Sequence, residues 1–311
     1  MKKIFSAVLF VMLSVSCASA ATGYLWIAGN DFDNPYDLES DSYGTGWSWS
    51  ASESLLSLNS SYTGEYIYIS SSYGDTITLN VTGNVIVNGG DVGVPLCCDG
   101  DLNINGTGTL RFIPSDFAEE YSLPTIQSSG NLIFSGANVI TTSEGELNSA
   151  IFSGYSDIIF TGDAQVTASS KGTQGYAVYT GRNVILGGNA DLTASGEGTD
   201  AAGIFIKAGN LTVNDDASLT ARGIGEGYAV EIREGSLEVN NDNVKLIADD
   251  KEHAVTKENS GSGTVNKETN AEQTEEPEPE NRKFKSSGGG GCNALFIWSS
   301  LGAFVLMLRK R

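Results

Sequence analysis

The sequence predicts an all-β protein, a right-handed single-stranded parallel β-helix of about 6–7 coils, followed by a disordered linker and a C-terminal hydrophobic helix. Three observations predict the β-helix. Short apolar-x-apolar segments recur about every 26 residues, each repeat holds three of them, and Gly, Asn and Asp stand between them. A β-sandwich would also contain many short strands, but it would not keep the same residue classes in register over six repeats.

Three rows of apolar residues define the repeat. The first row, with spacings of 30, 26, 26, 27 and 26 residues, consists of Leu102, Leu132, Ile158, Val184, Leu211 and Leu237. A second row follows it by about eight residues, at Leu110, Val139, Val166, Leu192, Leu219 and, after a one-residue insertion, Leu246. A third row precedes the first by six or seven residues, at Leu96, Ile126, Ile151, Val178, Ile204 and Val230. Three strands and three turns per repeat match one coil, whose apolar rows are buried only by neighbouring coils.

The first residues of the chain have the pattern of a secretory signal peptide. Residues 1–20 combine an N-terminal Lys pair, an apolar stretch and Ala18-Ser19-Ala20, which predicts cleavage after Ala20. A lipoprotein signal at Cys17 is the alternative.

Residues 21–75 are rich in Ser, Tyr and Trp and show no clear register. We expect them to form an N-terminal cap over the first open edge of the solenoid, because an uncovered sheet edge invites pairing with other chains. The β-helix would then cover residues 76–248. The acidic, Pro-containing residues 249–287 have few apolar side chains, and this composition predicts a disordered acidic linker.

Residues 288–311 contain three elements in order: a Gly-rich stretch that ends in Gly291-Cys292-Asn293, an apolar run at 294–308, and three basic residues. The apolar run is shorter than the roughly 20 residues of a spanning helix, although the preceding residues can extend it into the headgroup region. Its basic end is expected to stay in the cytoplasm and to leave the rest of the chain outside.

This order resembles the Synergist-CTERM class of C-terminal sorting signals. The resemblance implies that export and C-terminal sorting machinery processes the chain near Cys292 and anchors it at the cell surface. A plain C-terminal membrane anchor through residues 294–308 is the alternative.

Charge restricts the partners of this chain. The formal net charge is −20, from 18 basic and 38 acidic residues. Such a chain repels nucleic acid and anionic lipid, so nucleic-acid binding is excluded, whereas cation binding is compatible with it.

Acidic residues recur at one turn of the repeat. Five residues after the first-row positions stand Asp163, Asn189, Asp216 and Asp242, with Asp215 beside Asp216. Stacked coils would place them about 4.8 Å apart, where carboxylates repel unless a cation joins them, and oxygen ligands suit Ca²⁺. The alternative is turn chemistry, since Asp, Asn and Gly also favour tight turns.

Aromatic residues suggest where a sugar would bind, because sugar rings stack on exposed aromatic faces. Tyr176 and Tyr228 share a Gly-Tyr-Ala-Val context, and Tyr155 lies nearby in its own coil. The alternative is that these tyrosines cover coil edges. For Trp47 and Trp49 the interpretation we prefer is a plug at the end of the core.

Catalysis finds little support in the sequence. The single His of the chain, His253, lies in the linker, which leaves no histidine base in the solenoid. Basic residues that a polysaccharide lyase would use as base are present at Arg182, Lys207, Arg222 and Arg233, but no dense carboxylate cluster accompanies them. We therefore expect a non-catalytic protein.

Cys97 and Cys98 are neighbours in a predicted strand. One interpretation is a vicinal disulfide in an oxidising compartment. The other is one thiol inside the coil and one outside, because adjacent strand residues point to opposite faces.

The coils resemble the bacterial carbohydrate-binding domains of the polysaccharide-lyase-like β-helix type. The resemblance rests on the segments at 101–110 and 209–221 and extends over about residues 76–248. It implies polysaccharide binding and bound calcium without catalysis. A structural surface protein or adhesin with a protein partner, or a polysaccharide lyase, are the alternatives.

Overall fold

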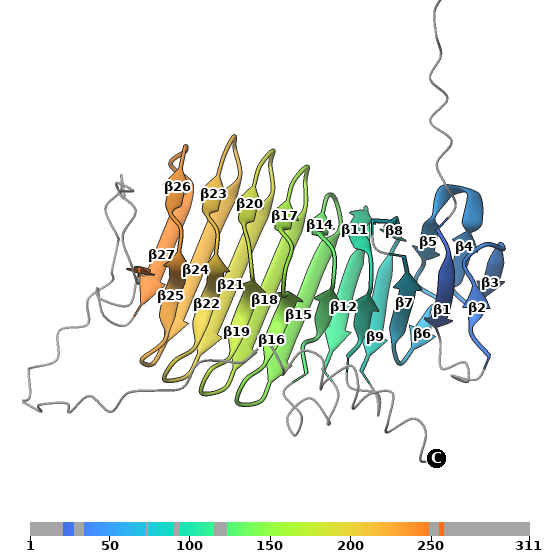
Figure 1. The fold of residues 1–311 in the computed structure, drawn as a ribbon, viewed down its shortest axis with the longest axis horizontal. Helices are drawn as coiled ribbons and strands as arrows, with labels where there is room; N and C mark the ends of the chain where they lie inside the picture. The colour runs from blue at the N-terminus through green and yellow to red at the C-terminus, as the bar shows by residue number, and fades with distance from the viewer. Residues whose placement is uncertain are drawn as a thin grey trace, which may run out of the picture. The chain divides into compact units, whose positions relative to one another are not determined.

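The computed structural model describes residues 21–27, 34–72, 74–89, 94–114, 123–248 and 255–257. The predicted signal peptide, most of the predicted linker and the whole predicted sorting signal with its helix therefore lie outside the described residues. The described chain is a parallel β-solenoid of about seven coils, as the sequence predicts (Figure 1). Its one helical element is a turn of 3-10 helix, η1 (Ala51–Glu53).

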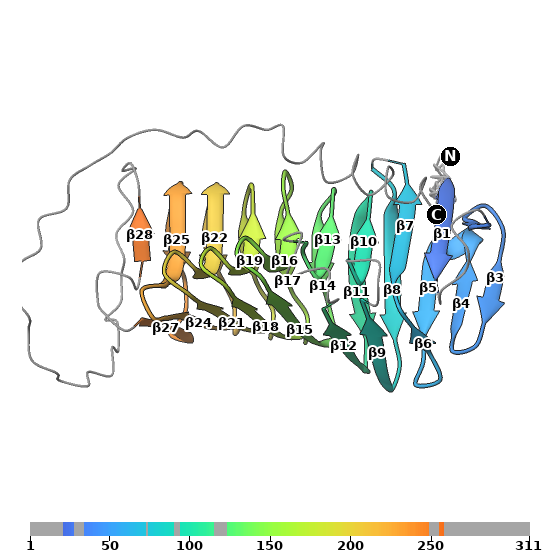
Figure 2. The ribbon, with the colours of Figure 1, turned by 90° about the horizontal axis from the view of Figure 1, so that it is seen from below.

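Sheet A contains ten strands, and neighbouring strands in the following order are hydrogen-bonded: β2 (Tyr36–Asp37), β1 (Gly23–Ile27), β7 (Ile67–Ser71), β10 (Leu96–Cys98), β13 (Ile126–Ser128), β16 (Ser149–Ser153), β19 (Tyr176–Thr180), β22 (Ala202–Ala208), β25 (Tyr228–Glu234) and β28 (Val255–Lys257). From β7 onward the pairs are parallel, and each strand belongs to the next coil (Figure 2).

Sheet B also contains ten strands, in the order β26 (Leu237–Val239), β23 (Leu211–Val213), β20 (Val184–Leu186), β17 (Ile158–Phe160), β14 (Leu132–Phe134), β11 (Asp101–Gly106), β8 (Thr76–Val81), β5 (Leu55–Leu58), β4 (Trp47–Ser50) and β3 (Ser42–Gly44). Sheet C contains eight, in the order β27 (Val244–Ala248), β24 (Ser218–Ile224), β21 (Asp191–Glu197), β18 (Gln165–Lys171), β15 (Asn138–Glu144), β12 (Thr109–Ile113), β9 (Asn84–Asn88) and β6 (Thr63–Gly64).

The strand register observed in sheets A and B is the one that the apolar rows predict. The six first-row residues pair one with the next along sheet B, and the six third-row residues do the same along sheet A. In the second row the placement of Leu246 is wrong, because Leu219 pairs with Val244 and Leu246 pairs with Ala221. The turn before β27 is one residue shorter than in the three coils before it, whereas the sequence had suggested an insertion.

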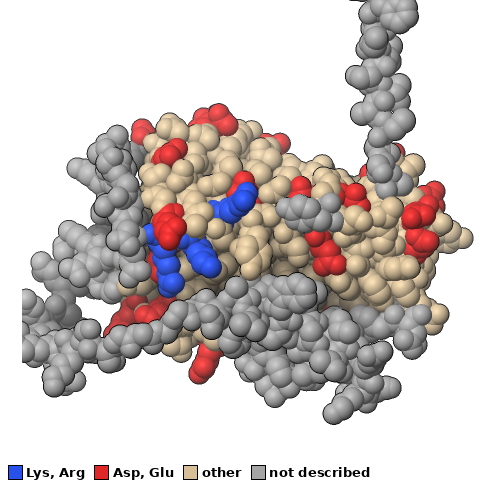
Figure 3. Space-filling view, in the orientation of Figure 1, with Lys and Arg blue, Asp and Glu red and all other residues tan. Residues whose placement is uncertain are grey.

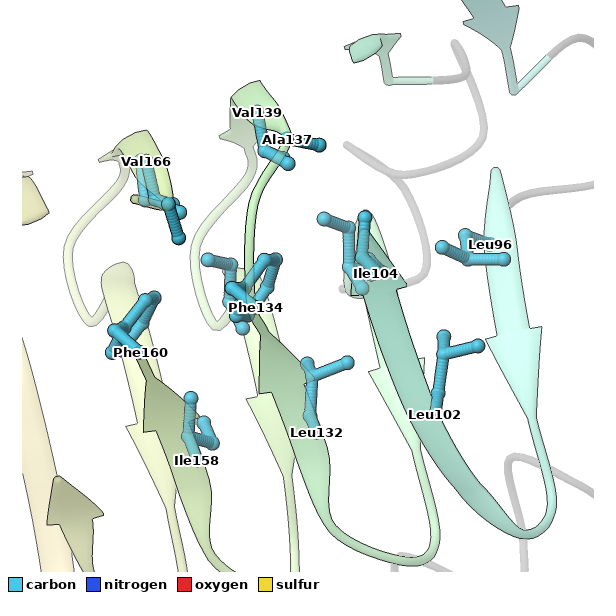
Figure 4. Close-up of a cluster of buried hydrophobic side chains, with 14 of the residues drawn as sticks. Leu96, Leu102, Ile104, Leu132, Phe134, Ala137, Val139, Ile158, Phe160 and Val166 are labelled. Carbon is cyan, nitrogen blue, oxygen red and sulfur yellow. The ribbon is translucent and has the colours of Figure 1, made fainter. Parts of the chain in front are cut away.

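The three rows fill the interior of the coils. Leu132, Phe134 and Ile158 are fully buried, and the rings of Phe134 and Phe160 stack with centroids 5.0 Å apart at 8° (Figure 4). Because each coil repeats the same inward residues, side chains of one kind lie on their counterparts in the next coil, and the core is continuous along the solenoid.

Antiparallel strands cover the N-terminal end. Strands β3, β4 and β5 pair antiparallel, as do β1 and β7, whereas β5 already pairs parallel with β8. The parallel pairing therefore begins at Leu55, before the expected start at residue 76. Trp47 and Trp49 are 4% and 2% exposed, and the indole Nε1 of Trp49 donates to the Leu38 carbonyl at 3.0 Å. This confirms that the two tryptophans plug the end of the core.

Sheet A continues past the expected boundary at residue 248. Strand β28 pairs parallel with β25, so that Val255 lies opposite Val230. Part of the predicted linker thus belongs to the solenoid. None of the described residues forms a helix that is long and apolar enough to cross a membrane.

The two neighbouring cysteines are free thiols with different surroundings. Cys98 is in the inward row and fully buried, and Cys97 is on the other side of strand β10, half-buried. The structure therefore has the inside–outside arrangement rather than a vicinal disulfide. Burial raises the pKa of the Cys98 thiol to about 12 and that of Cys97 well above its usual range.

Candidate functional site

The outer side of sheet A carries a column of stacked aromatic rings. Phe152, Tyr179 and Phe205 are register partners in β16, β19 and β22. Their neighbouring centroids are 4.9 and 5.1 Å apart at interplanar angles of 15° and 8°. Each ring follows directly after a fully buried residue of the third row, and strand alternation therefore directs it outward.

Tyr176 joins this column from the start of β19. Its ring is tilted by 33° against Phe205 with centroids 4.6 Å apart, and it lies 5.8 Å from Tyr179. We call Phe152, Tyr176, Tyr179 and Phe205 the aromatic face. Phe205 is only 3% exposed, whereas the other three side chains are half-buried.

A charged pair borders the aromatic face on the next coil. The guanidinium of Arg233 lies 4.8 Å from the Phe205 ring centroid, and its Nε donates to Oε1 of Glu231 at 3.0 Å. Glu231 is the register partner of Phe205. Burial, and then the charge of Glu231, raises the pKa of Tyr176 to about 12, although Arg233 opposes the rise. The hydroxyl of Tyr176 is therefore neutral and able to donate a hydrogen bond at any physiological pH.

Three cations lie where sheet A turns into sheet B. Ile206 and Ile232 are register partners in sheet A, and they are followed directly by Lys207 and Arg233. In the preceding coil their partner is Thr180, and Arg182 follows it by two residues. All three side chains are exposed, and we call them the basic corner. Figure 3 shows Lys and Arg side chains gathered in one region of the visible surface, toward the C-terminal coils, with acidic residues beside them.

A second, smaller aromatic group lies at the N-terminal end of the same sheet. The rings of Trp26 and Tyr68 stack with centroids 5.0 Å apart at 16°, and Tyr24 contacts Trp26 edge-on at 5.9 Å. The Tyr68 hydroxyl donates to Oδ2 of Asp99 at 2.9 Å. Burial and this carboxylate raise the pKa of Tyr68 strongly.

The structure separates the predicted tyrosines into two places. Tyr176 and Tyr228 occupy the same register two coils apart, on either side of Ala202. Tyr155 is 58% exposed in the turn from β16 to β17, three residues beyond Phe152. The predicted acidic column lies in the turns from sheet B to sheet C, so sheet C separates it from Tyr176 and Tyr228, which begin strands of sheet A. One face that holds all three tyrosines above the aspartates is not formed.

The acidic turn column forms hydrogen bonds within the turns themselves. Asn189 donates from its side chain to Oδ1 of Asp163 at 2.9 Å, and the Gly188 N–H donates to Oδ2 of Asp215 at 2.9 Å. Asp215 has a φ of 54°, in the turn position where Gly162 and Gly188 have φ values of 61° and 64°. Asp is one of the few side chains that tolerates this left-handed conformation. These contacts are those of turn chemistry.

Within the described residues there is no group of three or more His, Cys, Asp or Glu side chains arranged to hold a metal ion. Asp163 and Asp216 are exposed, as is Asp242, and each belongs to a different coil. Calcium binding at this column remains a prediction from the sequence.

A ladder of Asn and Asp side chains runs along the turn from sheet A to sheet B. The ladder consists of Asp101, Asn131, Asp157, Asn183, Asn210 and Ser236. The side chain of each of the first five accepts a hydrogen bond from the backbone N–H of the next residue in this series, over distances of 2.7–3.1 Å. The ladder satisfies backbone groups at a turn that no strand pairing covers. It is structural, and it supports the strands that end at the basic corner.

Sequence reasoning missed most of the aromatic face, although a signal was present. Phe152, Tyr179 and Phe205 each stand directly after a third-row residue, with spacings of 27 and 26 residues. Glu231 was also missed, and Arg233 was considered only as a possible lyase base. The residue before each first-row position is likewise Asn or Asp in five of the six coils from Asp101 to Ser236.

Comparisons with protein-family models, with curated proteins and with solved structures find no match for this chain. The fold and the site therefore define the class of protein on their own. It is a parallel β-solenoid whose sheet A carries an aromatic face with a basic corner beside it.

Proposed function

We propose that the chain is an exported, cell-surface-anchored and non-catalytic protein that binds a polysaccharide on the outer side of sheet A. The observation that supports this most is the aromatic face, because its rings continue over the three consecutive coils of β16, β19 and β22. Coils repeat at about 4.8 Å, so the face is a narrow strip along the solenoid that suits an extended polymer better than a compact ligand.

The chemistry of the strip matches what a sugar offers. The C–H groups of a sugar ring pack against aromatic carbon, and its hydroxyls need both donors and acceptors. Tyr176 supplies a hydroxyl, Glu231 supplies carboxylate oxygens, and the basic corner supplies N–H donors. Because Tyr179 has a ring on each side, its accessible part is the ring edge, whose positive rim favours contact with sugar oxygens.

The remaining parts of the proposal rest on the sequence. Export rests on the signal at residues 1–20 and anchoring on the sorting signal at 288–311. The calcium site predicted at Asp163, Asp215, Asp216 and Asp242 is left out of the proposal, because Asp163 and Asp215 accept hydrogen bonds at these turns. The non-catalytic assignment rests on the sequence alone, in which the single His, His253, follows the six repeats.

Retention of the mature protein on a panel of insoluble polysaccharides tests the proposal. We expect Tyr176→Ala to lose most of the retention and Tyr43→Ala to keep it. Tyr43 is the matched control, because it is an 85% exposed tyrosine in the N-terminal cap. Absence of retention of the wild-type protein on every polysaccharide, with and without Ca²⁺, would exclude carbohydrate binding.

A second arm distinguishes the adhesin alternative. Whole cells that display the protein are mixed with target surfaces before and after enzymatic removal of glycans. Polysaccharide binding predicts that adhesion disappears with the glycans. Adhesion that survives their removal would assign the surface a protein partner instead.

A further inference from the structure

One row of outward side chains runs along sheet A and joins its N-terminal end to the aromatic face. The members are register partners of one another, and each stands between two buried residues of its strand, so strand alternation directs all of them outward. Figure 2 shows the strands that carry the row side by side from β7 to β25. The row consists of Trp26, Tyr68, Cys97, Gln127, Phe152, Tyr179, Phe205 and Glu231.

The N-terminal end of this row contains the same components as the aromatic face. The rings of Trp26 and Tyr68 stack with centroids 5.0 Å apart, and those of the aromatic face stack with centroids 4.9 and 5.1 Å apart. At both places a carboxylate follows in the next coil. Asp99 accepts a hydrogen bond from Tyr68, and Glu231 is the register partner of Phe205. Two ring stacks that each end at a carboxylate, on one row, favour the same kind of ligand.

The N-terminal end of the row offers a sugar both ring carbon and hydrogen-bond acceptors. Tyr24 is 51% exposed and contacts Trp26 edge-on, so aromatic carbon is accessible there. A carboxylate accepts about four hydrogen bonds, and the Tyr68 hydroxyl uses one of them on the half-buried Asp99. Strands β1, β7 and β10 contain no Lys or Arg. We call Tyr24, Trp26, Tyr68 and Asp99 the N-terminal aromatic group.

We propose that the N-terminal aromatic group is a second subsite for the polysaccharide, and that one extended chain of uncharged sugar units lies along the row and contacts both groups. The proposal rests on the function proposed for the aromatic face. The units are uncharged because an acidic sugar would be repelled by the Asp99 carboxylate, and strands β1, β7 and β10 supply no cation to offset this repulsion.

The distance between the two groups sets the length of chain that reaches both. Tyr68 and Phe152 are three register steps apart, through Cys97 and Gln127, which corresponds to about 14 Å. Both intervening side chains are half-buried, and the Gln127 amide supplies donors and an acceptor to a chain that crosses it. A chain that is bound at one group meets the other at a high effective concentration, which raises the overall affinity.

Titration of the mature protein with neutral oligosaccharides of increasing length tests the proposal, with tryptophan fluorescence and calorimetry as readouts. Trp26 is half-buried on the outward row, whereas Trp47 and Trp49 lie in the core, so a bound sugar should change chiefly the emission of Trp26. We expect the affinity to rise by about tenfold or more once the chain is longer than about 14 Å. Trp26→Ala should remove both the fluorescence change and the rise with length.

Further variants separate binding from folding. Trp26→Phe keeps an aromatic ring and should keep most of the rise with length. Tyr24→Ala changes an exposed side chain and should reduce the rise without a change in melting temperature, so it tests the subsite even if Trp26→Ala does not fold. Tyr43→Ala is the matched control that should keep the whole rise, because Tyr43 is 85% exposed on strand β3 of sheet B.

A rise with chain length that is the same in the wild type, Trp26→Ala and Tyr24→Ala would overturn the second subsite and leave the aromatic face with its proposed function. Failure of the proposed function gives different results. Wild-type protein that binds no chain of any length would remove both proposals. Binding that Trp26→Ala abolishes and Tyr176→Ala leaves unchanged would make the N-terminal aromatic group the whole site.

Discussion

The carboxylate of Asp157 accepts two hydrogen bonds from Asn183 of the next coil, one from its backbone N–H and one from its side-chain amide, both to Oδ1 at 3.0 Å. Asn183 in turn accepts from the backbone N–H of Asn210 at 2.9 Å. Each member of the ladder therefore joins the coil before it to the coil after it, at the turn that supports the basic corner.

Replacement of Asn183 by Ala should destabilise the solenoid. The variant loses the side-chain bond to Asp157 and leaves the Asn210 N–H without its acceptor, which should lower the free energy of unfolding by about 1–3 kcal/mol. The matched control is Asn189→Ala, which removes one exposed side-chain bond and should cost no more than about 0.5 kcal/mol. Urea unfolding followed by far-UV circular dichroism measures both. Equal losses for the two variants would contradict a structural role of the ladder.

Substitutions of Asp215 should separate backbone strain from side-chain bonding. Asp215→Ala places a residue without a polar side chain in a left-handed conformation and removes the acceptor of the Gly188 N–H, at a cost of about 1–2 kcal/mol. Asp215→Gly should cost less, because Gly162 and Gly188 already occupy this turn position with φ values of 61° and 64°. Thermal unfolding of the two variants gives the comparison. If Asp215→Gly is the more damaging change, the conformation of the turn is not what selects the residue.

Thermal unfolding with and without Ca²⁺ tests whether calcium binds at the same turn. Because the carboxylates of Asp163 and Asp215 accept hydrogen bonds from the neighbouring coils, we expect the melting temperature to be the same in Ca²⁺ and in EDTA. A ligand that binds only the folded state raises its stability, so a rise with Ca²⁺ would be the sign of a bound ion. A rise that disappears in Asp216→Asn would restore the calcium site predicted from the sequence.

Removal of the Arg233 guanidinium should weaken polysaccharide binding more than it weakens the fold. Arg233 lies over Phe205 and bonds to Glu231, so Arg233→Ala deprives the aromatic face of its charged border. We expect about a five- to tenfold loss of affinity, which corresponds to roughly 1–1.4 kcal/mol. Arg222→Ala is the control, because Arg222 is an exposed arginine on sheet C. Equal affinities of the two variants in calorimetric titration would exclude Arg233 from the site.

The register of the solenoid was predictable because burial repeats it in every coil. Leu132, Ile158 and Val184 each occupy one inward position, and a single apolar pattern identifies them all. Leu246 was assigned to the second row in place of Val244, because the turn before β27 is shorter by one residue and both side chains lie on the same side of the strand. Alternation alone does not distinguish two such candidates.

The candidate site was less predictable than the fold. Tyr176 was found because its local sequence recurs at Tyr228. Outward residues are not constrained to be apolar, so no pattern identifies them. The stacking of Phe152 on Tyr179 depends on the register of two neighbouring coils. The acidic residues recur at one position of the sequence repeat and were therefore easy to find. Their hydrogen bonds depend on the left-handed turn at Asp215, which sequence spacing does not reveal.

The ionisation of Tyr176 should report the state of the aromatic face. Its pKa is about 12 in the folded protein, and an unfolded tyrosine has a pKa near 10, so the unfolded state loses this proton first. Fewer bound protons in the unfolded state mean that stability decreases as pH rises from about 10 to about 12 and does not depend on this group below about 10. Absorbance titration near 295 nm should therefore show a late-ionising tyrosine that Tyr176→Phe removes. A Tyr176→Phe variant that loses none of the late-ionising part of the curve would mean that Tyr176 is not packed against Phe205 as the structure shows.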